Sequence, residues 1–91
     1  NNGTHTITTE NRTILLNTSS GVATCNLPAA STAVGLTLTF KKILGGNNVV
    51  IDGNSSETID GATTTTLTAV NQSVTIQCNG VSWYILSNYV P

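Results

Sequence analysis

The chain has 91 residues, 38% of them hydrophobic and only 8% charged, with a formal net charge of −1 at pH 7. This length fits one domain, and the three basic residues form no cluster of the kind that captures nucleic acid or anionic lipid. No run approaches the roughly 18 consecutive apolar residues that a membrane span needs. We therefore expect a single domain over residues 1–91, with neither nucleic-acid binding nor membrane insertion.

Short apolar runs and period-two alternation fill the chain, and Gly, Asn, Asp, Ser or Pro interrupt them about every 8–12 residues. Only Ala29–Val34, after Pro28, suits a single helical turn. The fold class predicted is all-β, a small antiparallel β sandwich or a barrel-like or β-prism module. The predicted strands are His5–Thr9, Arg12–Asn17, Val22–Leu27, Leu36–Ile43, Asn48–Ile51, Glu57–Ile59, Thr63–Thr68, Gln72–Cys78 and Ser82–Ser87.

The last predicted strand is apolar on both faces. Trp83 and Ile85 point to one side and Tyr84 to the other, because residues i and i+2 of a strand share a face. Either two sheets enclose this strand or a second copy of the chain packs on it, and the small size favours the second copy. We predict Phe40, Trp83, Tyr84 and Ile85 as the anchors of the core or of an interface.

Two Asp-Gly corners, Asp52-Gly53 and Asp60-Gly61, predict turns, since glycine accepts a positive φ and Asp can cap nearby amides. Ile51 and Ile59 precede these corners and are expected to point inward. The exposed loop between the corners, Asn54, Ser55 and Ser56, is the candidate recognition loop. Calcium binding by the two aspartates is a weaker alternative, because the alternating ligand pattern of a calcium loop is lacking.

Cys25 and Cys78 both fall on apolar strand faces. This placement predicts two buried free thiols, with a disulfide as the alternative if their strands are neighbours. Two Cys and a lone His5 do not have the spacing of a structural zinc site. We expect no metal and no cofactor.

No catalytic motif stands out in the sequence. A glycosidase needs two carboxylates across a cleft, whereas Asp52 and Asp60 belong to turns. Neither a Ser-His-Asp arrangement nor a phosphate-binding loop is present, so we expect a protein that is not an enzyme. Rows of threonines such as Thr37/Thr39 and Thr63–Thr66 indicate solvated strand faces, with an ice-facing or carbohydrate-facing array as the sharper alternative.

The order of several short motifs resembles the β modules of bacteriophage tail fibres, tail spikes and other virion-surface proteins, which commonly occur as trimers. The likeness spans about residues 22–86, so 1–21 would be an N-terminal extension or connecting strands. Cys25 and Cys78 depart from the pattern, and both suit reduced thiols in a particle assembled in a bacterial cytoplasm. The matching pieces are Ala23–Pro28, Gly35 with Thr39–Lys42, Val49–Ile51, Thr58–Gly61, Ser73–Ile76, and Asn79-Gly80 with Trp83–Ile85.

The resemblance implies a homotrimeric, receptor-binding or structural module of a phage virion, in contact with other virion proteins and with a host glycan or protein receptor. Three copies around an axis would cover the second face of the last strand and remove exposed strand edges. The alternatives are a capsid decoration or cement protein, a secreted adhesin or carbohydrate-binding module, and part of a glycan depolymerase that lends Asp52, Glu57 and Asp60.

Overall fold

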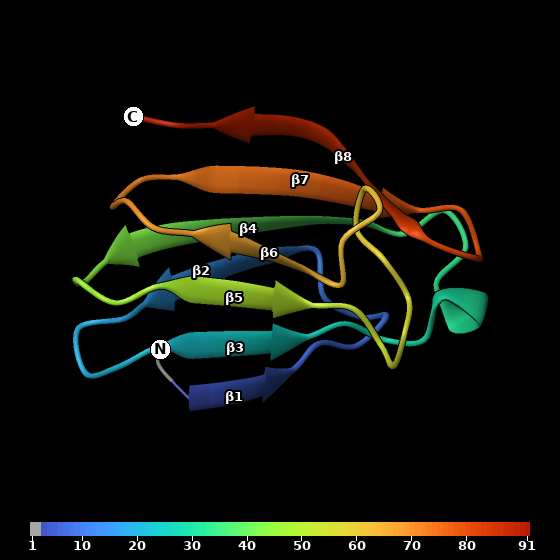
Figure 1. The fold of residues 1–91 in the computed structure, drawn as a ribbon, viewed down its shortest axis with the longest axis horizontal. Coiled ribbons are helices and arrows are strands. Elements are labelled where there is room, and N and C mark those ends of the chain that lie inside the picture. The colour runs from blue at the N-terminus through green and yellow to red at the C-terminus, as the bar shows by residue number, and fades with distance from the viewer. Residues whose placement is uncertain (1–2) are drawn as a thin grey trace.

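The computed structural model describes residues 3–91 and contains two four-stranded β sheets that pack face to face (Figure 1). The predicted all-β sandwich is confirmed. Among these residues there is one helical turn, the 3-10 helix η1 (Ala30–Thr32), which lies inside the stretch predicted for it. The strands are β1 (Gly3–Thr6), β2 (Thr13–Asn17), β3 (Ala23–Asn26), β4 (Thr37–Leu44), β5 (Val49–Asp52), β6 (Thr64–Leu67), β7 (Ser73–Cys78) and β8 (Trp83–Tyr89).

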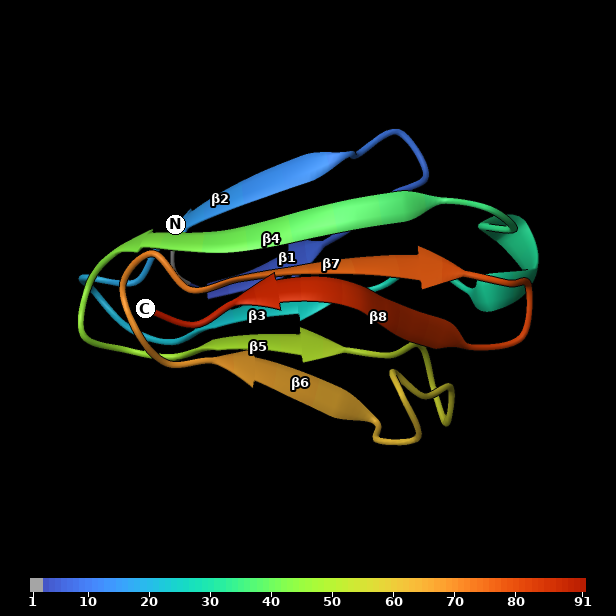
Figure 2. The same ribbon diagram turned by 90° about the horizontal axis from the view of Figure 1, so that it is seen from above.

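The chain changes sheet after each of its first four strands. The first sheet has the order β1-β3-β5-β6 and the second has β2-β4-β7-β8 (Figure 2). Because the chain returns to a sheet only after a strand in the other one, β1, β3 and β5 run parallel, as do β2 and β4. The pairings β4–β7, β5–β6 and β7–β8 are antiparallel. The prediction of an antiparallel sandwich is therefore wrong for half of the strand pairs.

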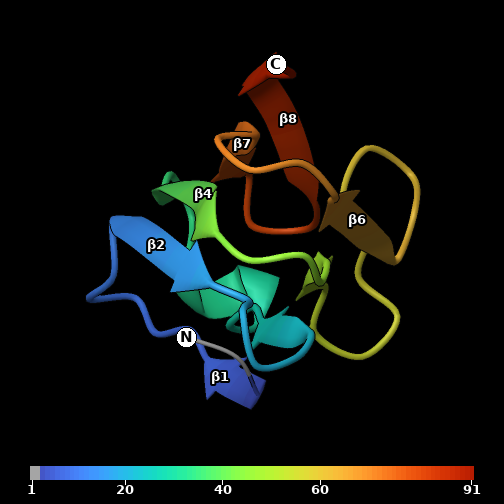
Figure 3. The ribbon, with the colours of Figure 1, turned by 90° about the vertical axis from the view of Figure 1, so that its left-hand side faces the viewer.

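This topology divides the molecule into two parts, which Figure 3 shows end-on. In the wound half, β1 to β5, successive strands form coils of a flattened helix, with β1–β2 as the first coil and β3–β4 as the second. In the closing half, β6 to β8, antiparallel strands complete both sheets. The resulting layers place the first coil along one side of the sandwich and β6 and β8 along the other.

The stretch Glu57–Ile59, predicted as a strand, is not one, because Glu57 and Thr58 have no regular structure and the chain turns at Asp60 and Gly61. Ile59 makes only isolated bridges, with Ala62 and with Trp83. Asp60 (φ 51°) and Gly61 (φ 88°) both have positive φ, which produces the tight reversal that the Asp-Gly corner predicts. A strand cannot continue through these two residues.

The first strand is also shorter than predicted. β1 ends at Thr6, whereas the sequence pattern extends to Thr9. The side-chain oxygen of Asn11 accepts hydrogen bonds from the amide (2.8 Å) and the hydroxyl (3.2 Å) of Thr8. These bonds turn the chain before β2, as Asn commonly does in loops.

The core lies between the two sheets. Phe40 and Trp83, two of the predicted anchors, are completely buried in it, and Ile85 is partly buried against it. Ile51 and Ile59 also point inward, as expected. Tyr84 is different, because 47% of its surface is exposed on the outside of β8.

One charged side chain, Lys42, is buried with the apolar residues of β4 and was not singled out by the sequence pattern. Only 1% of its surface is exposed. Its Nζ donates to the carbonyl oxygen of Thr68 (2.9 Å), which ties β4 to the loop between β6 and β7. The aliphatic stem thus fills the core while the ammonium group reaches a backbone acceptor.

Candidate functional site

Four connections meet at one end of the sandwich, here called the loop end: residues 7–12, 27–36, 53–63 and 79–82 (Figure 1). The shorter turns at 18–22, 45–48 and 68–72 lie at the opposite end, here called the turn end. Connections supported by a rigid sheet scaffold are common positions for binding residues. The loop end is therefore the candidate region for a binding site.

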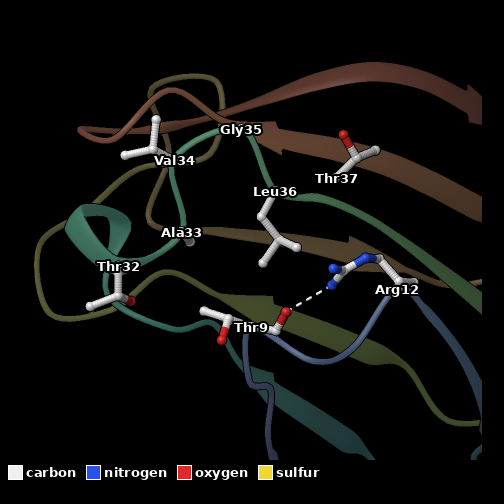
Figure 4. Close-up of a pocket in the computed structure, with 8 residues that line it drawn as sticks. All are labelled: Thr9, Arg12, Thr32, Ala33, Val34, Gly35, Leu36 and Thr37. Atoms are coloured by element: carbon white, nitrogen blue, oxygen red, sulfur yellow. Dashed lines mark hydrogen bonds between the residues drawn. The ribbon is translucent and has the colours of Figure 1, made fainter.

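A hollow of about 460 Å³ opens at the loop end (Figure 4). It combines a guanidinium group, three threonines and an aliphatic surface, and Leu36 points into the space between Arg12 and Ala33. Its size is within the range of about 300–1,000 Å³ that is usual for small-molecule sites. The residues that line it are Thr9, Arg12, Thr32, Ala33, Val34, Gly35, Leu36 and Thr37.

Arg12 is the cation of this pocket. Its Nη1 atom donates to the carbonyl oxygens of Thr9 and Asn11, each at 2.7 Å, so the guanidinium is held at the rim although the residue is exposed. These bonds use one of its three nitrogens, and a guanidinium carries five N–H donors in all. The remaining donors suit the planar, two-point recognition of a carboxylate or similar anion.

The threonines add hydroxyl groups on the other walls. The hydroxyl of Thr32 donates to the carbonyl oxygen of Ala29 (2.7 Å), which leaves its oxygen lone pairs as acceptors. Thr37 accepts from the side-chain amide of Gln77 (3.1 Å). No carboxylate, imidazole or thiol is among the lining residues. The pocket therefore offers a cation, hydroxyl groups and apolar surface for binding.

The candidate recognition loop lies at the same end of the molecule but does not line the pocket. Asn54, Ser55 and Ser56 are all exposed, and Ser55 has a positive φ of 54°. The carbonyl oxygen of Asn54 accepts the amide of Glu57 (2.9 Å), which closes the loop. Its role in recognition stays a prediction.

Two of the carboxylates beside this loop bind backbone amides. Oε1 of Glu57 accepts the amide of Ala30 (3.0 Å) and thereby attaches the loop to η1. Oδ1 of Asp60 accepts the amide of Ile85 (3.1 Å) on β8. Among residues 3–91, no three His, Cys, Asp or Glu side chains gather where they could hold a metal ion. These contacts give the acidic residues a structural role in fastening the loop.

Both cysteines are buried and free, as predicted. Burial raises the pKa of the Cys25 thiol to about 11, so the thiol stays protonated and unreactive at neutral pH. The Sγ of Cys78 accepts the amide of Gly80 (3.3 Å) and contacts the carbonyl oxygen of Ala30 (3.5 Å). The thiols act as small core residues, with Cys78 also holding the β7–β8 turn.

β8 and Val90, the residue that follows it, carry a group of exposed apolar side chains, here called the β8 surface. Tyr84, Leu86, Tyr89 and Val90 each have between 47% and 63% of their surface exposed. Nζ of Lys41, on β4, lies 5.5 Å from the centroid of the Tyr89 ring, which is within cation–π range. Exposed apolar groups on one strand are typical of an interaction surface.

Some hydroxyl groups of the threonine rows make hydrogen bonds within the protein. The hydroxyls of Thr39 and Thr75, on the paired strands β4 and β7, lie 3.0 Å apart and share a hydrogen bond. Thr64 and Thr66 of β6 point outward and are exposed. These contacts fit the interpretation of Thr as a strand residue on solvated faces.

Comparisons with protein-family models and with curated proteins add no relative. Among residues 3–91, no helix combines the length and apolar character needed to cross a membrane. No protein-family model matches the chain, and no curated protein matches it in sequence.

Proposed function

We propose that the protein is a non-catalytic recognition module of a virion-surface protein, of the tail-fibre or tail-spike type, and that it binds a host surface glycan at the loop end. The observation that carries this proposal is the pocket around Arg12, with its three threonines and aliphatic wall. The motif order described above supports the virion assignment.

The chemistry of the pocket favours a glycan that contains a carboxylated sugar. A guanidinium pairs with a carboxylate through two parallel hydrogen bonds, and threonine hydroxyls suit the hydroxyl groups of a sugar ring. Leu36 and Val34 offer apolar surface to the C–H face of such a ring. Because no acidic side chain lines the pocket, nothing there would repel the anion.

The proposed module binds its glycan without cleaving it. Glu57 and Asp60 each accept a backbone amide, and neither lines the pocket. Glycoside hydrolysis would need two carboxyl groups on either side of a bound sugar. Replacing Glu57 and Asp60 by their amides should therefore change loop stability and leave glycan binding intact.

A titration followed by two-dimensional NMR tests the site. Galacturonic acid oligosaccharides should shift the amide signals of Thr9, Thr32 and Thr37, whereas neutral glucose oligosaccharides should not. Arg12→Gln should weaken binding by about tenfold or more, since the charged bonds contribute about 1.5–3 kcal/mol. Lys41→Gln is the matched control, because it removes a cation from the outside of β4 and not from the pocket.

Unchanged affinity of Arg12→Gln, or equal binding of the neutral oligosaccharides, would contradict this site. Shifts confined to Asn54, Ser55 and Ser56 would instead place recognition on the loop between the two Asp-Gly corners. Both results can be read from the same set of spectra.

We further propose that the module works as a homotrimer, held in part by the β8 surface. Burial of Tyr84 and Leu86 at an interface would remove their apolar area from water, and three linked pockets would convert weak single-site binding into avidity. Sedimentation at micromolar concentration should give three times the chain mass, and Leu86→Asp should lower it. A monomeric parent protein would argue strongly against this assembly.

Position on the particle separates the tail-fibre proposal from the alternative of a capsid decoration protein. Cryo-electron microscopy of virions labelled with an antibody to this chain should place the label on the tail. Label on the capsid lattice would favour the decoration role, and absence from virions would favour a secreted carbohydrate-binding module.

A further inference from the structure

The two edge strands of the first coil, β1 and β2, lie on the same side of the sandwich (Figure 3). On the side of β1 that faces β3, the amide of Gly3 donates to the carbonyl oxygen of Val22 (3.0 Å), and the amide of Ile7 donates to that of Asn26 (2.9 Å). Because alternate residues of a parallel strand face the same neighbour, the backbone groups of Thr4 and Thr6 face the open side. β1 therefore presents backbone donors and acceptors to a further strand.

β2 has the same property. The carbonyl oxygen of Arg12 accepts the amide of Thr39 (2.9 Å), and Thr18 donates its amide to Leu44 (2.8 Å). The backbone N–H and C=O groups of the even-numbered residues of this strand thus point towards β4. The backbone groups of Thr13 and Leu15 point to the open side. In the part of the chain that the structure describes, no strand pairs with either outer edge.

A groove of about 210 Å³ lies between these two edges. Its apolar walls come from Ile7, the residue after β1, and from Ile14 and Leu16 of β2, and His5 and Thr6 of β1 add polar groups. Ile7 and Leu16 are nearly fully buried, so the groove is the open end of the core itself. The complete lining is His5, Thr6, Ile7, Asn11, Ile14, Leu15 and Leu16.

Inside the molecule, the next coil fills the corresponding space. His5 pairs in register with Cys25, which pairs with Ile51. The side chains of Cys25 and Ile51 are completely buried between the sheets. The stacking of one coil on the next is thus an interface that the protein already uses, and the groove is where this stack stops.

The opposite side of the second sheet is closed at the start of β8. The amide of Trp83 donates to the carbonyl oxygen of Thr58 (2.9 Å), and the amide of Asp60 donates to the carbonyl oxygen of Trp83 (3.0 Å). The amide of Ile85 donates to the carboxylate of Asp60 (3.1 Å). A register irregularity follows in β8, where Ile76 pairs with Ile85 and Thr75 with Ser87. Covered and bulged edges resist the addition of strands. This contrast identifies the side formed by β1 and β2 as the side on which a further coil of strands could be added.

We infer that the β1–β2 side is a docking surface for a further β coil. The occupant is an extended polypeptide that runs parallel to β1, crosses to the second sheet and runs parallel to β2, with aliphatic side chains at its inward positions. Backbone hydrogen bonds along both edges supply the pairing, and the aliphatic side chains fill the groove. A second copy of this chain docked head to head fits less well, because it would set two such grooves against each other and fill neither.

An extended variant tests this inference independently of the glycan site. A second copy of residues 3–22 is placed directly before Gly3, with His5→Ile in the copy. In register, Gly3 occupies the position that Ala23 has in the next coil, so the turn at 18–22 can lead into it. The added coil should raise the melting temperature, and amide exchange of Thr6 and Leu15 should slow by at least about tenfold.

Two controls make the outcome specific. In the first, the copy carries Ile7→Asn, Ile14→Asn and Leu16→Asn, which keeps its length and removes its aliphatic inward positions. In the second, Thr6→Pro and Leu15→Pro are made in the original coil, where the lost amides face the open side. The first control should show no slowing of amide exchange at Thr6 and Leu15. The second control lacks these two amides and should show no rise in melting temperature from the added coil, and the same prolines should leave the melting temperature of the unextended protein nearly unchanged.

Unchanged exchange at Thr6 and Leu15 in the extended variant would overturn the inference. So would protection of these two amides in the unextended protein that increases with its concentration, because this would show the edges pairing between copies.

Discussion

The wound half and the closing half build the same sandwich from different strand pairings. In the wound half, each of the first four strands is followed by a strand of the opposite sheet, so parallel pairing needs no crossover helix. In the closing half, β7 and β8 form an antiparallel hairpin, and Trp83 at the start of β8 is completely buried. The difference teaches that turns between the two sheets join the parallel strands of the wound half, whereas the closing half is a hairpin whose largest buried side chain is Trp83.

The turns of the wound half are bonded to each other at the turn end. The hydroxyl of Thr18 donates to the carbonyl oxygen of Asn47 (2.6 Å). In return, the side-chain amide of Asn47 donates to the carbonyl oxygen of Thr18 (2.8 Å). Thr18 is completely buried, and Gly45 lies against it with φ 104°. Successive turns thus stack in the same way as the strands that they connect.

The largest expected effect is in the closing half. Trp83→Ala should lower the free energy of unfolding by about 3–5 kcal/mol, because it opens a large cavity between the sheets. Trp83→Phe should cost less, since Nε1 of Trp83 is buried without a hydrogen-bond partner. Urea unfolding measures the free energy of unfolding of both variants. An equal loss in the two would contradict the view that Trp83 stabilises the protein mainly by filling space in the core.

Gly45→Ala breaks the stacked turns of the wound half. A Cβ atom there would collide with the backbone of Thr18 and Ser19, and the positive φ disfavours any L side chain. We expect a loss of at least about 2 kcal/mol in urea unfolding. Gly46→Ala is the matched control, because its Cβ would meet no atom within 4 Å. Equal stability of the two variants would contradict the importance of this close approach.

Thr18→Val tests the same turns at smaller cost. The substitution keeps the shape of the side chain and leaves the carbonyl oxygen of Asn47 without its 2.6 Å donor. Loss of a buried partner costs about 1–3 kcal/mol. Thermal unfolding should show this loss, while Thr39→Val, on the outward face, should change stability by less than about 1 kcal/mol.

The last expected effect is a pH dependence of stability at Cys25, which is absent at neutral pH and appears only above about pH 9. Its pKa is about 11 in the folded protein against 9.0 for an exposed thiol, so above pH 9 the unfolded state loses its proton first. Stability should therefore fall as the pH rises from 9 towards 11. The melting temperature of Cys25→Ala should fall less over this range, and parallel curves for both proteins would contradict a buried protonated thiol.

Much of the fold could be predicted from the sequence because β structure leaves local signals. Period-two alternation identified most strands and the inward positions of Phe40 and Trp83, and the Asp60-Gly61 corner is a reversal as expected. The buried free thiols also followed from alternation. These features depend on a residue's immediate neighbours, so the chain alone determined them.

Strand direction and the candidate pocket were decided by the tertiary structure. Alternation reports which face a residue occupies and not which way its strand runs, so the parallel coils could not be predicted. Arg12, Thr32 and Leu36 converge from separate segments, and nothing in the sequence around the chain's one arginine distinguishes it as a pocket residue. The burial of Lys42 and the bond from Ala30 to Glu57 likewise depend on segments about 26 residues apart. Such contacts arise only when the two sheets pack, because the packing alone brings those segments together.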